Sequence, residues 1–151
     1  MIDKEGAIFL ESNVKGLMQE CITAMNIKMA KWREDTEFAT LREGDIRVFA
    51  QLRGQPFTVS QLGRLMGITR QAVHLAVQRL QQEGMVNLVD SPADRKQKII
   101  EITEKGQRFR HLVAKHLQHQ EQQICQQLGQ TTFDTLRDAL LELQSFYKQN
   151  G

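Results

Sequence analysis

Residues 68–84, ITRQAVHLAVQRLQQEG, combine hydrogen-bonding and apolar side chains at helical spacing. One face of such a helix would be apolar and would pack on a protein core: Ala72, Val73, Ala76, Val77 and Leu80. The opposite face would be polar and would carry Gln71, His74, Gln78 and Gln82. Arg70 stands just before the first of these residues. Glutamine can pair with adenine through two hydrogen bonds and arginine with guanine. The pattern therefore predicts a helix that reads base edges with its outer face.

The residues before this helix predict a second helix and a tight turn. Thr58 and Gln61 match a capping box, which would start a short helix running to about Met66. Gly67 can adopt a positive φ, and Thr69 offers a hydroxyl N-cap for the next helix. Gly84 would end that helix as its C′ residue. Residues 58–84 thus have the spacing of a helix-turn-helix.

A β-hairpin is predicted directly after the helix-turn-helix. The segments MVNLV and KIIEI are rich in β-branched and large apolar residues, and the polar, turn-forming segment DSPADRKQ separates them. Two helices followed by a hairpin form a winged helix.

Longer helices are predicted on both sides of this region. Apolar residues between 8 and 32 indicate one long amphipathic helix, and residues 45–52 a short one that ends near Gly54. Thr103 can cap a helix over residues 104–128, which Gly129 would stop, and Thr131 or Thr132 would start the last helix. An apolar stripe of nearly heptad spacing runs along the last helix: Phe133, Leu136, Leu140, Leu143 and Tyr147.

Length and composition narrow the class of protein further. A chain of 151 residues, 40% hydrophobic and 25% charged, suits one folded domain with helical extensions. The net charge is only +2, but residues 58–98 carry six Lys and Arg against three Asp and Glu. The sequence has no long apolar run and no secretory signal, so we expect a cytoplasmic protein without a membrane segment. An enzyme is not expected, because no nucleophile with a base, phosphate-binding loop or carboxylate pair stands at motif spacing.

From Leu41 to Gly106 the chain resembles the MarR family of bacterial transcriptional regulators. The resemblance rests on FTVSQLGRLMGITRQAVHLAVQRLQQEGMV, on the Asp94-Arg95 pair in DSPADRKQKIIEITEKG, and on TEKG opening the next helix. It implies a mainly α fold with a small β-wing, in which residues 1–151 form a single chain of this family. Within it, residues 41–103 would form a winged helix-turn-helix, and long dimerisation helices over residues 6–36 and 104–149 would flank it. It also implies a homodimeric repressor that binds double-stranded DNA at an inverted repeat and needs no cofactor. A small-molecule effector or oxidation would release it.

The candidate DNA-binding residues fall into three groups. The groove-facing side chains are Arg70, Gln71, His74 and Gln78, and Leu75 could meet a thymine methyl group. The second group lies at or near the starts of helices, where hydroxyls, amides and free backbone N–H groups can bind phosphate oxygens: Ser60, Gln61 and Thr69. The wing adds Arg95, Lys96 and Lys98, and the resemblance implies that Asp94 orients the wing through an ionic contact. For Arg79, pairing within the domain is at least as good an interpretation as a DNA contact.

The sequence departs from the family pattern at several positions. Leu88, Ile99 and Glu101 stand where the wing strands are often basic, so we expect weaker attraction to phosphates. Arg42 stands where the family usually has a threonine or serine cap. Thr40 with Glu43 could move the start of that helix upstream.

Candidate signal-sensing residues have competing interpretations. Cys21 could be a redox sensor, as in one branch of the family, or a buried core residue. Met18, Met25 and Trp32, with Met29 and Phe38, could line an effector pocket or pack in the core or a dimer. His111, His116 and His119 invite a zinc site, but no cysteine or carboxylate nearby completes a ligand set, so no metal is expected. A winged helix that serves only as a protein-interaction scaffold remains the alternative function.

Overall fold

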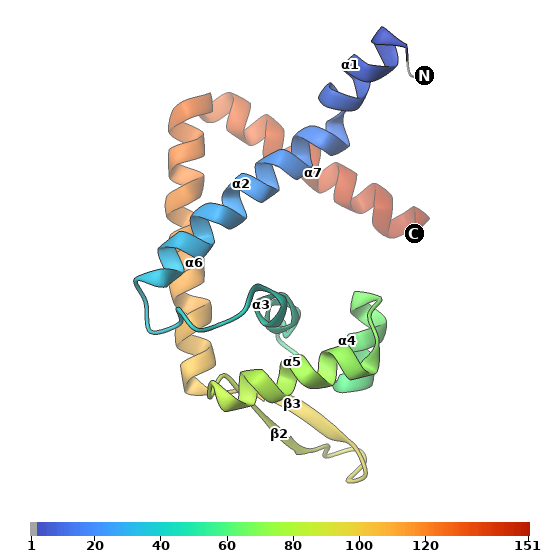
Figure 1. Cartoon of the computed structure of the whole chain (residues 1–151), viewed down its shortest axis with the longest axis vertical. Helices are drawn as coiled ribbons and strands as arrows, with labels where there is room; N and C mark the ends of the chain where they lie inside the picture. The colour runs from blue at the N-terminus through green and yellow to red at the C-terminus, as the bar shows by residue number, and fades with distance from the viewer. Residues whose placement is uncertain (1–2) are drawn as a thin grey trace. The chain divides into compact units, whose positions relative to one another are not determined.

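The computed structural model describes residues 3–151 and divides into two compact units, one ending at Thr103 and the other spanning Glu104–Gly151. The first unit contains α1 (Lys4–Ser12), α2 (Val14–Glu34), α3 (Glu43–Ala50), β1 (Phe57–Thr58), α4 (Val59–Met66), α5 (Arg70–Gln82), β2 (Val86–Asp90) and β3 (Lys98–Ile102). The second contains α6 (Glu104–Leu128) and α7 (Gln130–Asn150) (Figure 1). The predicted fold, mainly α with a small β-wing, is confirmed.

The long helix predicted between residues 8 and 32 is interrupted at Asn13. This residue is extended, with φ −69° and ψ 154°, and its side chain accepts a hydrogen bond from the Gly16 N–H at 2.9 Å. Its side-chain amide also donates to the carbonyls of Phe9 and Leu10. Asn13 therefore ends α1 and caps α2, and the prediction of one continuous helix was wrong.

The core of the first unit lies among α3, α4, α5 and the sheet. Phe49 of α3, Leu62 of α4 and Met85 are almost completely buried. On α5 the buried residues are Val73, Ala76, Val77 and Leu80, which confirms most of the predicted inner face. Ala72 is exposed and does not join this core.

The sheet has strand order β1-β3-β2, with every neighbouring pair antiparallel. β2 and β3 form the predicted hairpin, with Val86 opposite Ile102 and Asp90 opposite Lys98. β1 adds two residues to the other edge of β3, and no alternating pattern in the sequence indicated this strand. In Figure 1 the hairpin extends beyond α5 as a separate arm, the wing.

Most predicted helix ends are confirmed, but two caps differ. α3 begins at Glu43 with Arg42 as its N-cap and without a side-chain cap. The Thr40 hydroxyl donates instead to the Glu83 carboxylate at 2.8 Å, so the predicted upstream start of α3 was wrong. α7 begins at Gln130 with Gly129 as its N-cap, so neither Thr131 nor Thr132 caps it.

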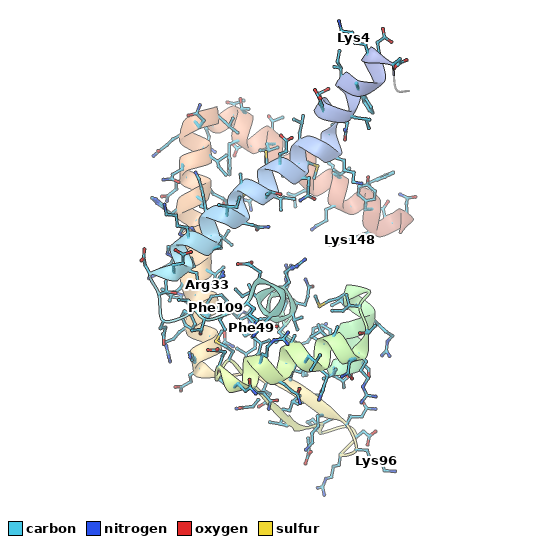
Figure 2. All side chains as sticks on the ribbon, viewed as in Figure 1. Lys4, Arg33, Phe49, Lys96, Phe109 and Lys148 are labelled. Atoms are coloured by element: carbon cyan, nitrogen blue, oxygen red, sulfur yellow. The ribbon has the colours of Figure 1, made fainter. Side chains whose placement is uncertain are left out.

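The end of α2 is tied to the start of α3 by an ion pair. The Nη2 atom of Arg33 lies 2.7 Å from Oε1 of Glu43. The Arg33 side chain is only 9% exposed although it is charged. Figure 2 labels it at the end of α2, close to where the chain turns toward α3.

The second unit is a pair of helices joined at Gly129. α6 and α7 pack on each other, and the bend at Gly129 uses a φ of +81°. Leu136, Leu140 and Tyr147 of the predicted α7 stripe are exposed in the single chain. Among residues 3–151, no helix is both long enough and apolar enough to cross a membrane.

Candidate nucleic-acid interface

The turn between α4 and α5 places the two helices in close contact. Gly67 has a φ of +65°, and the N–H of Ile68 donates to the Gly63 carbonyl at 3.1 Å. A Cβ atom at Gly63 would lie 3.1 Å from the Ile68 carbonyl oxygen, so a side chain there would push the turn away. The Thr69 hydroxyl accepts from the Ala72 N–H at 3.1 Å and starts α5 as predicted. This geometry is a helix-turn-helix.

A Schellman motif ends α5 and joins it to the wing. The N–H of Met85 donates to the Leu80 carbonyl at 2.8 Å, and the N–H of Gly84 donates to Gln81 at 2.9 Å. The Gly84 φ is +74°, as the predicted C′ position requires. Thr103, after β3, donates its hydroxyl to the Gly84 carbonyl and its N–H to the Met85 carbonyl. Both ends of the hairpin are therefore fixed at the end of α5.

The outer face of α5 carries the predicted base-reading side chains. Those predicted to face the groove are all exposed: Arg70, Gln71, His74 and Gln78. Leu75 is 43% exposed on the same outer side, although it is apolar. Gln82 is exposed as well. Polar side chains that project from a helix of this class can enter the major groove, which is wide enough for one helix.

The predicted phosphate contacts lie at the starts of α4 and α5. Gln61 accepts from the Thr58 N–H through Oε1 at 2.8 Å, and the Thr58 hydroxyl accepts from the Gln61 N–H at 3.2 Å. The capping box is thus confirmed, and it occupies the Gln61 oxygen while leaving the amide NH₂ for another acceptor. Ser60 is half-buried in the first turn of α4, whereas Thr69 is exposed at the start of α5.

Arg79 makes an ion pair inside the domain. Its guanidinium contacts the carboxylate of Asp45 in α3 at 2.7 Å and 2.9 Å. The hydrogen bonds that Arg79 donates to Asp45 raise the pKa of Arg79, with a smaller Coulombic contribution, while burial acts in the opposite direction. The structure therefore favours the structural interpretation of Arg79 over a DNA contact.

The wing carries exposed cations around a tight turn. Arg95 and Lys96 are exposed and form no ion pair within residues 3–151, and Figure 2 shows Lys96 at the tip of the hairpin. Lys98 is paired with Asp90 on the opposite strand. The Asp94 carboxylate accepts from the Lys96 N–H at 3.0 Å. It makes no ion pair with any described residue, so the expected ionic contact is replaced by a hydrogen bond that shapes the turn.

The candidate sensing residues of α2 are not gathered in a closed core. Cys21 is exposed, so the interpretation of a buried cysteine was wrong for the single chain. Met25 is also exposed, and Met18 and Trp32 are half-buried. An open pocket of about 400 Å³ lies elsewhere, at the α6–α7 bend. It is lined by Gln118, Glu121, Gln122, Cys125, Gln130 and Phe133.

The histidines of α6 differ in their surroundings. His111 and His119 are exposed, whereas His116 is half-buried. Burial lowers the pKa of His116, and the nearby His119 lowers it further. Within residues 3–151, no three His, Cys, Asp or Glu side chains are grouped to hold a metal ion.

A helix-turn-helix followed by an antiparallel wing defines the winged-helix class of nucleic-acid-binding domains. Residues 40–97 match the model of the MarR family, in agreement with the resemblance that the motifs indicated. The members of this family are transcriptional regulators and not enzymes.

Solved structures share this fold over nearly the whole chain. FabT of Streptococcus pneumoniae, solved in complex with DNA, is 14% identical with a TM-score of 0.77, over 91% of this chain and 97% of that one. MarR is 14% identical with a TM-score of 0.75, over 91% and 99%. RV1404 from Mycobacterium tuberculosis is 18% identical with a TM-score of 0.72, over 91% and 96%. A comparison of the sequence with curated proteins found no match.

Two residues that pair with cations of the interface were not singled out from the sequence. Asp45 and Asp90 neutralise Arg79 and Lys98, which lie 34 and 8 positions away along the chain. No local pattern indicates the first pair, whereas the cross-strand position of the second follows once the hairpin register is known. Gln82, which the sequence placed on the polar face but not among the groove-facing side chains, is exposed and extends the outer face of α5 by one further turn.

Proposed function

We propose that this chain is a sequence-specific DNA-binding transcriptional regulator that acts as a homodimeric repressor. The observation that carries the proposal is the exposed outer face of α5, where Gln71, His74 and Gln78 stand beside Arg70 and opposite the buried core. FabT, which has the same fold, was solved with DNA bound. In this proposal α5 enters the major groove, and the residues at the starts of α4 and α5 bind phosphates. The wing lies along the backbone or the minor groove.

The long helices supply the proposed dimer interface, which residues 6–36 and 104–149 would form. α1 and α2 expose large apolar side chains in the single chain, including Phe9 at 67% and Leu17 at 49%. α7 does the same with Leu140 and Phe146. Apolar surface of this extent on helices is typical of an interface between subunits. A second copy is the proposed occupant, since a two-fold dimer places two winged domains on adjacent half-sites.

Such a dimer would read an inverted repeat with half-sites about one helical turn apart. It would repress by occupying a site that the polymerase needs, and it would act in the cytoplasm, where the chromosome lies. A small-molecule effector or oxidation would release it by favouring a spacing of the two domains that does not fit adjacent grooves. The candidate sensing residues are the exposed Cys21 and the neighbouring Met18, Met25 and Trp32.

Selection from a random pool of duplex DNA tests the proposal, followed by binding of the enriched duplex over a series of salt concentrations. The expected result is an inverted repeat bound by two chains, with affinity that falls as salt rises. Gln71→Ala should weaken binding to that repeat, and Gln81→Ala, at an exposed position of α5 away from the groove-facing side chains, is the matched control. Analytical ultracentrifugation of the protein with and without DNA gives the number of chains.

Failure to enrich any duplex at low salt, with or without reductant and added metal ions, would contradict the proposal. The chain would then fit the alternative function, a winged helix that serves as a protein-interaction scaffold. Enrichment of a single asymmetric site bound by one chain would retain DNA binding but contradict the homodimer.

A further inference from the structure

Four residues form a single stripe along the outer face of α5. Gln71, Leu75, Gln78 and Gln82 are spaced four, three and four positions apart, which places them on one side of a helix. All four are exposed, and they lie opposite the residues of α5 that are buried. We call these four residues the amide stripe. It contains no charged side chain.

The charged groups of α5 lie at its margins or are already paired. Arg70 is the first residue of the helix, and Arg79 is held by Asp45. Glu83, just beyond the last residue of α5, accepts a hydrogen bond from Thr40. The middle of the helix therefore presents amides and one leucine, with His74 beside them.

These side chains match one kind of base pair better than the other. A glutamine amide can donate to N7 and accept from N6 of adenine at the same time, and an apolar side chain can contact the thymine C5 methyl group. Guanine is most often read by arginine or lysine, and cytosine can be read by a carboxylate. The amide stripe has neither of these groups.

We propose that the amide stripe reads A·T base pairs, with Leu75 as the residue that contacts a thymine methyl group. This inference rests on the proposed function, because it applies only if α5 enters the major groove. The inference extends the proposed function by predicting which base pairs of the half-site lie beneath the centre of α5. It also assigns a specificity-determining role to an apolar side chain that is 43% exposed without packing in the core.

The test uses the duplex that the selection enriches, with single atoms or groups removed from its bases. Replacing one thymine by deoxyuridine removes only the methyl group, and replacing one adenine by 7-deazaadenine removes only the N7 acceptor. Each thymine and adenine of a half-site is replaced in turn, and the Kd is measured by fluorescence anisotropy with the full-length protein.

The wild-type protein should lose about threefold to tenfold in affinity when deoxyuridine replaces the contacted thymine. Leu75→Ala should bind the unmodified duplex about as weakly as the wild type binds the modified one, and should no longer distinguish the two. This substitution is on an exposed helix position, where alanine maintains the helix. Gln81→Ala, on the same helix but outside the amide stripe, should retain the full effect of the methyl group.

The outcomes separate this inference from the proposed function. Tight, sequence-specific binding that is insensitive to every deoxyuridine replacement would overturn the role of Leu75 and leave the DNA-binding function intact. A selected half-site with only G·C pairs beneath the centre of α5 would overturn the preference for A·T pairs. An absence of duplex binding would overturn the proposed function itself.

Discussion

The guanidinium of Arg79 in α5 and the carboxylate of Asp45 in α3 form a two-pronged ion pair. Nη2 of Arg79 lies 2.7 Å from Oδ1 of Asp45, and Nε lies 2.9 Å from Oδ2. The Asp45 side chain is only 5% exposed, whereas that of Arg79 is 36% exposed. The partly buried pair thus connects α5, which bears the proposed base-reading residues, to α3. Its planar geometry restricts rotation of α5 about its own axis.

Asp45→Asn should lower both thermal stability and DNA affinity. The substitution leaves the Arg79 charge without its partner in a partly buried contact, and we expect the midpoint of thermal unfolding to fall by about 5 °C. Affinity should fall even well below that midpoint, because α5 loses its orientation. Circular dichroism and DNA titration at 10 °C measure the two effects. Asp3→Asn is the control, because asparagine can replace aspartate as the N-cap of α1. An unchanged affinity for Asp45→Asn would contradict the orienting role.

Arg95→Ala should weaken binding to all DNA sequences to a similar degree. The side chain is exposed near the tip of the wing, where it can meet phosphates. Removing one phosphate contact should lower the slope of log K against log salt by about one. Titrations of the selected duplex and of an unrelated duplex at several salt concentrations measure this slope. If the loss is confined to one base position, Arg95 reads sequence and the phosphate assignment is wrong.

Asp90→Asn should have the opposite effect. Asp90 pairs with Lys98 across the hairpin, and both side chains are exposed. Without the carboxylate, the ammonium group is available to a phosphate and the wing gains one unit of positive charge. We expect tighter binding to unrelated duplex DNA and a salt slope steeper by about one. The double variant Asp90→Asn with Lys98→Gln is the control and should return the slope to the wild-type value or below it.

Much of this fold could be predicted because its signals are local. Thr58, Thr69 and Gly84 act within a few residues of themselves, so their caps and turns follow from the sequence. The break at Asn13 was missed because the apolar residues continue across it. The prediction followed those residues and did not consider Asn13, which is polar and forms the cap. The partners of Thr40 and Arg79 lie 43 and 34 positions away, respectively, and only the packed chain identifies them.

Thr58→Ala and Thr69→Ala should have similar effects on stability but different effects on binding. Each removes a hydroxyl that accepts from a helix N–H, which costs about 1 kcal/mol of unfolding free energy. Only Thr69 is proposed to contact a phosphate, so only Thr69→Ala should lower DNA affinity further. Urea denaturation and DNA titration of both variants distinguish the roles. Equal affinities would remove Thr69 from the interface.

The stability of the protein should fall as the pH is lowered below about 6.5. Burial, and to a lesser extent His119, lower the pKa of His116 from its usual 6.5 in the folded chain. The unfolded chain therefore binds the proton at a higher pH, and protonation favours unfolding between pH 6.5 and the folded pKa. Above that window the free energy of unfolding retains its full contribution from this group.

His116→Gln should reduce this dependence on pH. Urea denaturation at a series of pH values, from about 7.5 to 5.5, measures the slope of unfolding free energy. His111→Gln, at an exposed position of the same helix, should leave the slope unchanged. A slope that is the same in wild type and His116→Gln would show that other groups cause the acid sensitivity.

The hydrogen bonds at Gly84, Met85 and Thr103 connect the end of α5 to both ends of the wing through backbone carbonyl groups. The outward side chains of α5 take no part in these hydrogen bonds, and they lie outside the buried core. If α5 enters the major groove as proposed, substitutions on this face can therefore change which DNA site is bound at little cost in stability. A gene duplicate could acquire a new target site through a few such changes while its fold stays intact, and an engineered regulator could be made in the same way.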